Sequence, residues 1–581
     1  MSSPLLHINN LQVDFVTDIG HTTAISNISL EIKRGEIVAI VGESGSGKSV
    51  TSLSILQLLP APPARYVQGE ILFCPDGKTP VNLLTQSPQQ MRRIRGNQIA
   101  MIFQEPMTSL NPVFTCGNQV MEAIRLHKPM SKKTATEKTI ELFRKVKLPN
   151  PEQLFHRYPH QLSGGQKQRV MIAMAMSCNP ALLICDEPTT ALDVTVQKTI
   201  LQLVKSLQQT EQMGVIFITH DLSVVAEIAD RAIVMYKGAI VEEGSVAQLF
   251  KDPQHPYTKG LLACRPILHQ KGERLPVVSD FLEGRKTEVR SRQSESPQSE
   301  TSNAKNEDQR HTKDKAQAKE VLIKAEGVKV WFPASKTWLG KTTGFTKAVD
   351  DVSFEVYKGE TLGLVGESGC GKTTLGRTLL RLIEPTDGKI YYNHTDLTAT
   401  TSNALKALRK DIQIVFQDPY SSLNPRLTIG SAIAEPLKVH GLIPDTQQRK
   451  DRVIELLEKV NLQADHFYRY PHEFSGGQRQ RIVIARTLAL NPSFVVCDES
   501  VSALDVSVQA QVLNLLNDLK KEFGFTIIFI SHDLSVVRYI SNRIMVMNKG
   551  KIEETGNADQ VFYHPQKAYT QQLIASVPKG L

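Results

Sequence analysis

Two short stretches of the chain combine glycines, a lysine and a hydroxyl residue at the spacing of a phosphate-binding loop. The first is Gly42-Glu-Ser-Gly-Ser-Gly-Lys-Ser, and the second is Gly366-Glu-Ser-Gly-Cys-Gly-Lys-Thr. Glycines let the backbone turn its N–H groups inward around a phosphate chain, and the lysine adds positive charge. Each stretch therefore predicts a loop that binds the phosphates of a nucleotide.

In this interpretation Lys48 and Lys372 pair with the β- and γ-phosphates, whereas Ser49 and Thr373 offer the hydroxyl that ligates Mg²⁺. A structural glycine turn is the alternative for one such loop alone, and the duplicate makes it negligible. The candidate ATP-binding residues of the loops are Gly42, Ser44, Gly45, Ser46, Gly47, Lys48, Ser49, Gly366, Ser368, Gly369, Cys370, Gly371, Lys372, Thr373 and Thr374.

Apolar strands and helices must position these loops. Ile37–Val41 and Thr361–Val365 predict strands that lead into them. Helical patterns follow at Ser52–Leu59 and Leu375–Leu382. This strand–loop–helix context separates a nucleotide loop from a chance match, and the helix N-terminus adds partial positive charge toward the phosphates.

Paired acids follow a second predicted strand in each half of the chain. These strands are expected at Ala181–Cys185 and Phe494–Cys497, because a continuous apolar run is typical of a buried parallel strand. Ligands gather at the carboxyl ends of such strands, so the first acid would hold Mg²⁺ through water and the second would polarise the attacking water. In isolation, an acidic turn is a reasonable alternative for either pair. The first acids are Asp186 and Asp498, and the second acids are Glu187 and Glu499.

The chain repeats itself once. His220-Asp-Leu-Ser-Val-Val returns at His532, an offset of 312 residues, and the other motifs return in the same order. Ordered motifs in a constant frame indicate two homologous domains. We expect these domains at residues 1–282 and 321–581, each with a C-terminal extension.

The segment between the domains, residues 283–320, has a different composition. It is rich in Ser, Gln, Glu and Lys and has almost no aliphatic residues, so it cannot bury enough apolar surface to offset its ordering entropy. We expect a disordered linker with a reach on the order of 30–35 Å. A passive tether is the favoured interpretation, and a regulatory or partner-binding role is the alternative.

Composition narrows the function classes. The 581 residues, 41% hydrophobic and 22% charged, are typical of a soluble multidomain protein. No apolar stretch approaches the roughly 18–20 residues of a membrane-spanning helix, and the start resembles no signal peptide, so we expect a cytoplasmic protein. The net charge of +9 is spread too thinly to indicate nucleic acid, and the seven cysteines form no C-x-x-C pair.

A further motif, Leu162-Ser-Gly-Gly-Gln, is followed by a helical pattern at Lys167–Met176 and then by the first acidic strand. This motif resembles the signature motif of the ABC ATPase family. Together with the loops and the acids, it extends the resemblance to that family over nearly the whole chain outside the linker. The resemblance implies an α/β fold of two tandem P-loop ABC ATPase domains. Each would have a mainly parallel sheet core, an antiparallel β subdomain and a helical signature subdomain, with ATP and Mg²⁺ as cofactors.

The resemblance also implies residue roles. In the family, ATP lies between the phosphate loop of one domain and the signature of the other, which implies two composite sites at the interdomain interface. The adenine role of Phe332 has alternatives, because Trp331 is adjacent and either ring could belong to the core. The implied residues are Gln104 and Gln417 as γ-phosphate sensors and metal ligands; Ser163, Gly164, Gly165, Gln166, Ser475, Gly476, Gly477 and Gln478 as signatures; Asp193 and Asp505 in the D-loops; Phe15 and Phe332 against adenine; and Glu187, Glu499, His220 and His532 in catalysis.

Departures from the family pattern are few. Phe474 replaces the usual leucine before the second signature, and Ser500 replaces the usual proline after the second glutamate. Neither should touch a phosphate, so we expect two hydrolytically competent sites. At Cys370 the helix N-terminus should favour a thiolate, so a bulky thiol reagent should inhibit and ATP should protect.

The surroundings of the motifs resemble the ATPases of oligopeptide/dipeptide/nickel importers, as a fusion of a D-type and an F-type subunit. Phe103-Gln-Glu-Pro-Met-Thr-Ser-Leu-Asn-Pro, its counterpart at Phe416, and His255-Pro-Tyr-Thr carry this resemblance. It implies two transmembrane permeases, an extracytoplasmic substrate-binding protein and a position on the cytoplasmic face of the inner membrane. Only Cys264 lies where some D-type subunits carry a cysteine cluster, so no iron–sulfur cluster is expected.

The favoured function is therefore ATP hydrolysis that powers uptake of peptides, with nickel, glutathione-like compounds or other small solutes as further candidates. The alternative is a soluble tandem ABC ATPase that acts on ribosomes or nucleic acid. Such proteins usually join their domains by a long charged helical arm, whereas residues 283–320 contain Ser-Pro and no helical apolar stripe. This favours the importer, for which no direct nucleic-acid contact is expected.

Overall fold

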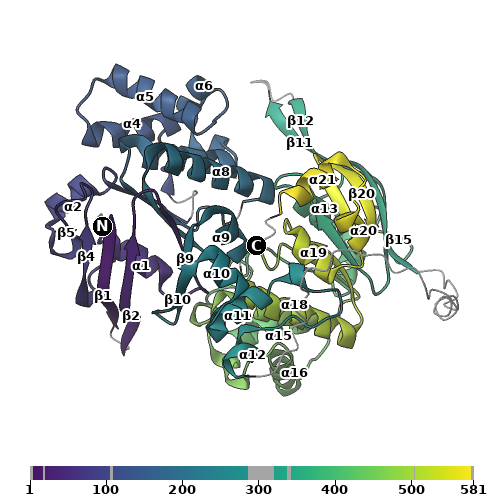
Figure 1. Ribbon diagram of the computed structural model, residues 1–581. Coiled ribbons are helices and arrows are strands. Elements are labelled where there is room, and N and C mark those ends of the chain that lie inside the picture. The colour runs from purple at the N-terminus through teal and green to yellow at the C-terminus, as the bar shows by residue number, and fades with distance from the viewer. Residues whose placement is uncertain are drawn as a thin grey trace, which may run out of the picture. The chain divides into compact units, whose positions relative to one another are not determined.

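The chain folds into two compact units. Unit 1 comprises Met1–Cys264, Asp505–Ser507 and Ser576–Leu581, and unit 2 comprises Arg265–Leu504 and Val508–Ala575. The predicted linker at 283–320 lies outside the described residues, apart from 283, 284 and 320. The computed structural model (Figure 1) describes residues 4–17, 20–104, 109–190, 192–284, 320–336, 342–502 and 504–577.

The central sheet of unit 1 is mainly parallel. Its strand order is β10-β9-β3-β8-β7-β6, and only the β9–β10 pair is antiparallel among the pairings of the described strands. Every residue of β3, β7 and β8 is buried, as expected for strands covered on both faces. The strands are β3 (Ile37–Val41), β6 (Ile99–Ile102), β7 (Leu182–Asp186), β8 (Gly214–Thr219), β9 (Arg231–Tyr236) and β10 (Ala239–Ser245).

A four-stranded antiparallel sheet packs against this core. Its order is β2-β1-β4-β5, and alternating residues such as Ile28 and Ile71 join Val38 and Ile40 of the central sheet in one apolar cluster. The strands are β1 (Leu6–Thr17), β2 (Gly20–Ile32), β4 (Ala64–Phe73) and β5 (Val81–Asn82).

Helices complete unit 1, and α4, α5 and α6 gather at one end of it (Figure 1). With α7 they enclose a second apolar cluster around Val120, Phe143 and Val170. The helices are α1 (Lys48–Ile55), α2 (Pro88–Ile94), α4 (Cys116–His127), α5 (Lys132–Lys145), α6 (Pro151–Phe155), α7 (Gly164–Ala175), α8 (Val194–Glu211), α9 (Leu222–Ile228), α10 (Val246–Lys251) and α11 (Pro256–Ala263), with 3₁₀ turns η1 (Leu83–Thr85), η2 (Pro159–Gln161) and η3 (Met176–Cys178).

Unit 2 repeats the same strand orders, β20-β19-β13-β18-β17-β16 and β12-β11-β14-β15. Its strands are β11 (Val321–Lys336), β12 (Thr342–Tyr357), β13 (Thr361–Val365), β14 (Asp387–Tyr392), β15 (Thr395–Asp396), β16 (Ile412–Val415), β17 (Phe494–Asp498), β18 (Thr526–Ile530), β19 (Arg543–Asn548) and β20 (Lys551–Asn557). The repeated strand orders confirm the predicted architecture of two homologous α/β domains, each with a mainly parallel central sheet and an antiparallel sheet.

The helices of unit 2 also follow the repeat, with one addition. Residues 265–284, which the repeat places at the end of the first domain, belong to unit 2 and carry η4 (Pro266–Leu268) and α12 (Val278–Leu282). The others are α13 (Lys372–Leu379), α14 (Ser402–Leu408), α15 (Ile429–Val439), α16 (Thr446–Lys459), α17 (Gly476–Leu488), α18 (Val506–Phe523), α19 (Leu534–Ile540), α20 (Ala558–Tyr563) and α21 (Ala568–Ala575), with η5 (Ala464–Tyr468) and η6 (Pro471–Glu473).

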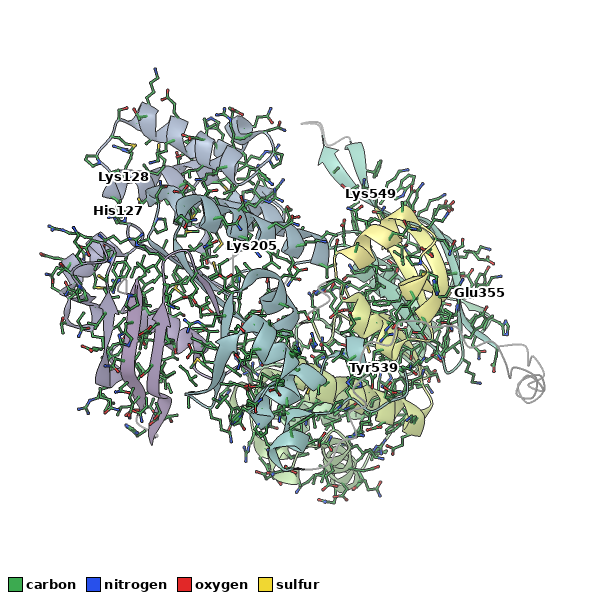
Figure 2. The ribbon with its side chains drawn as sticks, viewed as in Figure 1. His127, Lys128, Lys205, Glu355, Tyr539 and Lys549 are labelled. Atoms are coloured by element: carbon green, nitrogen blue, oxygen red, sulfur yellow. The ribbon has the colours of Figure 1, made fainter. Side chains whose placement is uncertain are left out.

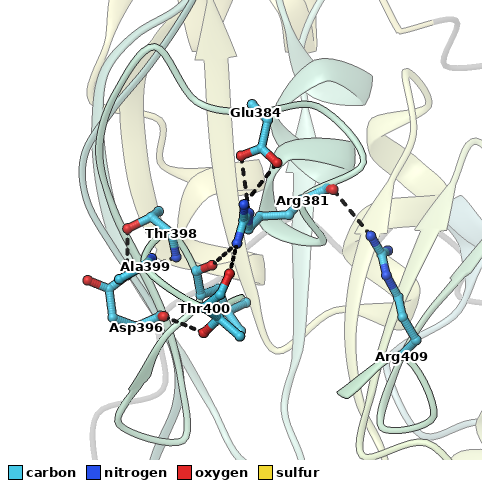
Figure 3. A network of polar contacts seen from close by, with 8 residues as sticks. Arg381, Glu384, Asp396, Thr398, Ala399, Thr400 and Arg409 are labelled. Atoms are coloured by element: carbon cyan, nitrogen blue, oxygen red, sulfur yellow. Dashed lines mark hydrogen bonds and ion pairs between the residues drawn. The ribbon is translucent and has the colours of Figure 1, made fainter. Parts of the chain in front are cut away.

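The helices after the phosphate loops start earlier than the apolar pattern indicated. α1 begins at Lys48, directly after the left-handed Gly47, and ends before Gln57, whose φ of 48° is incompatible with a helix. In unit 2, Arg381 (φ 48°) closes α13 in the same way. Its guanidinium donates to the carbonyl oxygens of Leu397 and Thr400, both at 2.7 Å, and to Glu384, which fixes the end of α13 to the β15 loop (Figure 3).

Candidate functional site

The lysine of the phosphate loop in unit 1 forms hydrogen bonds with the backbone of its own loop. The Lys48 ammonium donates to the carbonyl oxygens of Gly42 and Glu43, both at 2.8 Å, and the side chain is buried. Gly47 has φ 100°, and a Cβ there would lie 2.6 Å from Ile25 Cγ2, so only glycine fits. Lys48 thus lies inside the loop, where bound phosphates would replace these carbonyl oxygens as its hydrogen-bond partners.

The loop of unit 2 has the same geometry. Lys372 donates to the carbonyl oxygens of Gly366 at 2.8 Å and Glu367 at 2.9 Å. The side chain of Cys370 packs under the loop, in the place that Ser46 takes in unit 1, because a Cβ on Gly366 would meet its Sγ at 2.7 Å. Burial raises the pKa of the Cys370 thiol. The expectation that a thiolate is favoured there is therefore wrong, because desolvation outweighs the effects of the Lys372 charge and the nearby backbone N–H groups, which lower the pKa.

A hydroxyl and a carboxylate meet beside each loop. Ser49 Oγ donates to Asp186 Oδ1 at 3.2 Å, and Thr373 Oγ1 donates to Asp498 Oδ1 at 2.8 Å. Burial raises the pKa of both aspartates, that of Asp186 to about 6. Asp498 Oδ2 is buried and accepts no hydrogen bond within the described part of the chain. Paired hard oxygen donors with spare accepting capacity suit Mg²⁺.

The glutamate after Asp186 is the centre of a polar cluster. Glu187 Oε2 accepts hydrogen bonds from Gln104 Nε2 and Thr190 Oγ1, both at 3.0 Å, and lies 3.3 Å from His220 Nδ1. Burial alone would raise the pKa of Glu187, but His220 and Thr190 lower it to about 2. The same contact raises the pKa of His220, against the effect of its burial. The cluster therefore holds an ionised carboxylate beside the phosphate loop.

Unit 2 has a matching cluster. Gln417 Nε2 donates to Glu499 Oε2 at 2.8 Å, and His532 Nδ1 lies 3.7 Å from Glu499 Oε1. Burial opposes ionisation of Glu499, yet the contact with His532 lowers its pKa. Glu187 and Glu499 both adopt left-handed backbone angles, with φ of 47° and 46°. Strain of this kind at matching residues of both repeats is typical of functional sites.

The signature serines begin helices. Ser163 Oγ accepts from the backbone N–H of Gln166 at 3.3 Å, and the Gln166 side chain accepts from Ser163 N–H at 3.2 Å. Ser475 and Gln478 form the same capping box. This box explains why α7 begins at Gly164 rather than at Lys167 as the apolar pattern indicated.

The close packing of each signature helix depends on glycine. A Cβ on Gly165 would lie 2.6 Å from Val196 Cγ1, and one on Gly477 would lie 2.2 Å from Val508 Cγ1. Gly164 and Gly476 meet no comparable obstacle. The second glycine of each signature is therefore required by packing alone, whatever ligand the helix N-terminus meets.

The remaining sequence-based candidates are less clearly placed. Phe15 packs partly buried against the antiparallel sheet, whereas Phe332 is exposed. Trp331 Nε1 donates to Asp350 Oδ1 at 3.2 Å, so that ring has a structural partner. The adenine-stacking role of both phenylalanines stays a prediction.

The D-loop aspartates each hold backbone N–H groups. Asp193 caps α8, where its Oδ1 accepts from Val196 N–H at 2.9 Å. Asp505 belongs to unit 1, where its Oδ2 accepts from the N–H of Ser44, in the phosphate loop, at 2.8 Å.

Two tyrosines of the C-terminal extensions reach the phosphate loops and were not among the sequence-based candidates. Tyr257 Oη accepts from Glu43 N–H at 2.9 Å, and Tyr569 Oη accepts from Glu367 N–H at 3.2 Å. The signal was available, because both tyrosines precede a threonine at the 312-residue offset. Tyr257 is fully buried, and burial raises the pKa of its hydroxyl.

An arginine next to the second magnesium candidate was also missed. Arg377 Nη2 lies 3.7 Å from Asp498 Oδ2. The position that corresponds to Arg377 in the first loop helix is Leu53, which packs against the apolar core. The two acidic sites therefore differ by one positive charge.

Comparison with known proteins identifies the class. The model of the ABC transporter family matches residues 25–190 and 349–502, and that of the oligopeptide/dipeptide transporter C-terminal region matches residues 241–287 and 554–580. The chain belongs to the ABC transporter family, as an importer ATP-binding protein of the oligopeptide/dipeptide type, and it is an ATPase.

Its relatives include glutathione import ATP-binding protein GsiA. The protein of Escherichia coli (strain K12) is 49% identical over 579 residues, which cover 99% of this chain and 89% of that protein. The protein of Salmonella typhimurium (strain LT2) is 49% identical over 578 residues, which cover 99% of this chain and 90% of that protein. A solved bacterial ABC transporter cassette, MJ0796, is 29% identical and covers 41% of this chain and 99% of its own, with a TM-score of 0.37.

Proposed function

We propose that this ATPase drives uptake of glutathione or a related short peptide through two separate membrane permeases, with an extracytoplasmic binding protein that delivers the solute. The observation that carries the proposal is the carboxylate of Glu187, fixed by Gln104, Thr190 and His220 beside a phosphate loop and matched at Glu499. The substrate follows the relatives, whose name records glutathione import. The expected position is the cytoplasmic face of the inner membrane.

Hydrolysis follows from the contacts within each cluster. Ionised Glu187 accepts a proton from the attacking water, and His220 keeps that carboxylate charged and oriented. Lys48 and the loop N–H groups hold the β- and γ-phosphates. Glu499, His532 and Lys372 would do the same in unit 2.

Mg²⁺ fits the hydroxyl–carboxylate pairs, where it would neutralise charge that develops on the phosphates. The residues that would hold it are Ser49, Asp186, Gln104, Thr373, Asp498 and Gln417. Ser49 and Thr373 already point at their aspartates, so each pair needs little rearrangement to accept the cation.

Exposed apolar side chains of unit 1, among them Phe103 next to Gln104 in the sequence, support a permease-docking face. Phe103, Val113, Phe114 and Leu126 are all exposed, and Gln119 donates to the carbonyl oxygen of Phe114 at 3.1 Å, which fixes the loop that carries Val113 and Phe114. Large exposed apolar groups in one region mark interaction sites. Phe416, Tyr420, Val439 and Leu442 are exposed in unit 2.

A basic cavity of about 500 Å³ adjoins Leu126. It is lined by Arg92, Arg93, Arg95, Asn97, Leu126 and His127, and Figure 2 labels His127 at the end of α4. Burial lowers the pKa of His127, so the positive charge of the cavity comes from the arginines. Such a cavity beside apolar side chains fits a cytoplasmic permease loop that carries an acidic residue.

Uptake by cells tests this function directly. Cells that express the protein with its permeases should accumulate labelled glutathione, and the Glu187→Gln, Glu499→Gln variant should reduce uptake to background. Val113→Asp should lower recovery of the permeases without loss of ATP binding, whereas Val67→Asp, at an exposed valine of β4, should not. Uptake of another solute but not of glutathione would refute the substrate and leave the ATPase assignment intact.

A further inference from the structure

Residues 265–284, here the docking segment, come from the end of the first repeat but pack against unit 2. The segment contains η4 and α12, and its side chains Leu275 and Val278 are buried. Its receptors are Asn514 on α18 and Arg538 and Tyr539 on α19, and Figure 2 labels Tyr539 within unit 2. These three residues on two helices form a defined binding surface for the segment, here called the seat.

Asn514 binds the backbone of the segment in both directions. Leu275 N–H donates to Asn514 Oδ1 at 2.9 Å, and Asn514 Nδ2 donates to the Leu275 carbonyl oxygen at 2.8 Å. Both hydrogen bonds are buried. A side-chain amide that satisfies both the backbone N–H and the carbonyl oxygen of one residue allows that residue to be buried without an unpaired backbone donor or acceptor.

The neighbouring helix α19 binds three more carbonyl oxygens. Tyr539 Oη donates to Glu273 O at 2.6 Å. Arg538 Nη2 donates to His269 O at 2.7 Å and to Ile267 O at 3.2 Å. Arg538 is itself buried, and its guanidinium lies about 5 Å from the rings of Phe562 and Tyr563, which orient it.

An ion pair lies at the edge of the surface between the segment and unit 2. Arg274 Nη1 lies 2.9 Å from Asp518 Oδ2, and both side chains are largely exposed. A pair of this kind contributes little on its own because water and salt screen it. The buried backbone contacts therefore carry the docking.

The first repeat lacks this seat. At the 312-residue offset, Asn514 corresponds to Gln202, Arg538 to Ala226 and Tyr539 to Glu227. Gln202 is exposed on α8, Ala226 has no side-chain donor, and an ionised Glu227 can only accept hydrogen bonds. All three receptors differ between otherwise matching helices, so the seat is specific to the second repeat.

We propose that the docking segment is an intramolecular anchor that holds the first repeat's chain to the second repeat without nucleotide. Its partner is the surface formed by Asn514, Arg538 and Tyr539. The two repeats should then stay associated even when the chain is cut between residues 285 and 319. This inference does not depend on the transported solute.

The test uses the full-length protein with a protease site inserted between residues 285 and 319, cleaved after purification without nucleotide and with EDTA. The two fragments should co-elute in size-exclusion chromatography at low micromolar concentration. The Asn514→Ala, Arg538→Ala variant should separate after cleavage, whereas Gln202→Ala, the matched control in the first repeat, should not. Separation of the wild-type fragments, or continued association of the double variant, would overturn the proposal.

Amide hydrogen exchange distinguishes a variant that has lost only this contact from a variant that fails to fold. In the uncleaved protein, Asn514→Ala should speed exchange of the Leu275 amide by ~10-fold, because its buried acceptor is removed. Amides of β14, a strand of the antiparallel sheet that pairs with β11 and β15, should be unchanged. Tyr539→Phe, which removes one hydroxyl and keeps the ring, should give a smaller effect in the same peptide. Unchanged protection of Leu275 in Asn514→Ala would refute the contact itself.

Discussion

His220 Nδ1 lies 3.3 Å from Glu187 Oε2, and the two side chains ionise as a pair. Burial opposes both charges, yet the contact lowers the pKa of Glu187 and raises the pKa of His220. The corresponding distance between His532 Nδ1 and Glu499 Oε1 is 3.7 Å. The Glu187 carboxylate is thus oriented before any nucleotide arrives, as its proposed role in accepting a proton from water requires.

The pair makes stability depend on pH. The pKa of Glu187 is lowered from 4.5 to about 2, so its contribution is present above pH 4.5 and is lost as pH falls toward 2. The pKa of His220 is raised above 6.5, so its contribution is present below pH 6.5 and is lost as pH rises through the raised value. The pair should therefore stabilise most between pH 4.5 and 6.5.

His220→Ala should then lower the free energy of unfolding of unit 1 by about 1–3 kcal/mol near pH 5.5, and by less above pH 8. Thermal unfolding of wild type and variant across this range measures the difference. A loss of stability that is the same at pH 5.5 and pH 8.5 would contradict the charged pair.

Tyr257→Phe should weaken ATP binding to the first phosphate loop. The change removes the hydroxyl that accepts from Glu43 N–H and leaves a loop donor without its partner. We expect a loss of affinity of about 3–10-fold, measured with a fluorescent ATP analogue. Tyr236→Phe is the control, because its ring centroid lies 4.3 Å from that of Tyr257, at a tilt of 34°, and Tyr236 lies outside the loop. Equal effects of the two changes would contradict a specific role of the Tyr257 hydroxyl.

Arg377→Leu should strengthen binding of a divalent cation in unit 2. The guanidinium lies 3.7 Å from Asp498 Oδ2 and repels a cation that shares this carboxylate. Because the arginine is partly exposed, we expect only about a 3-fold change in the Mn²⁺ dissociation constant with a non-hydrolysable ATP analogue. The reverse change, Leu53→Arg, should weaken the first site. If neither variant shifts Mn²⁺ binding, the arginine has no influence on the cation.

Cys370→Ser should keep ATP turnover within about 2-fold of wild type, since Ser46 occupies the same place in the first loop. The buried thiol with its raised pKa should react slowly with a bulky maleimide at pH 7, and ATP should slow the reaction further. The rate of labelling, followed by mass spectrometry, measures both effects. Labelling as fast as that of an exposed thiol would contradict the packing under the loop.

Local motifs predicted the strands and loops around the candidate site, because each motif lies on one continuous stretch. The loops, the acids and the capping serines stand where their spacing indicated, and the strands Ile37–Val41 and Thr361–Val365 match to the residue. The thiol of Cys370 was misjudged, since sequence shows the helix N-terminus but not the burial that opposes it. Contacts between distant residues, such as Tyr257 with Glu43, depend on tertiary packing that periodicity does not encode.

The sequence also gave no indication that residues 265–284 pack against unit 2. A repeat boundary follows from sequence similarity between the two halves and does not show which half a segment packs against. Leu275 N–H donates to Asn514, a residue 239 positions further along the chain. The difference between Asn514 and Gln202 is visible in the sequence, but its meaning requires the helix faces on which these residues lie.

The most direct test of the importer function is recovery of partners by the Glu187→Gln, Glu499→Gln variant, from gently solubilised membranes with ATP present. These changes should leave nucleotide binding intact and slow turnover at least ~100-fold, which should stabilise the ATP-bound assembly. We predict that two polytopic membrane proteins are recovered with the variant. Recovery of ribosomes or nucleic acid without membrane proteins would contradict the importer and leave the ATPase in place.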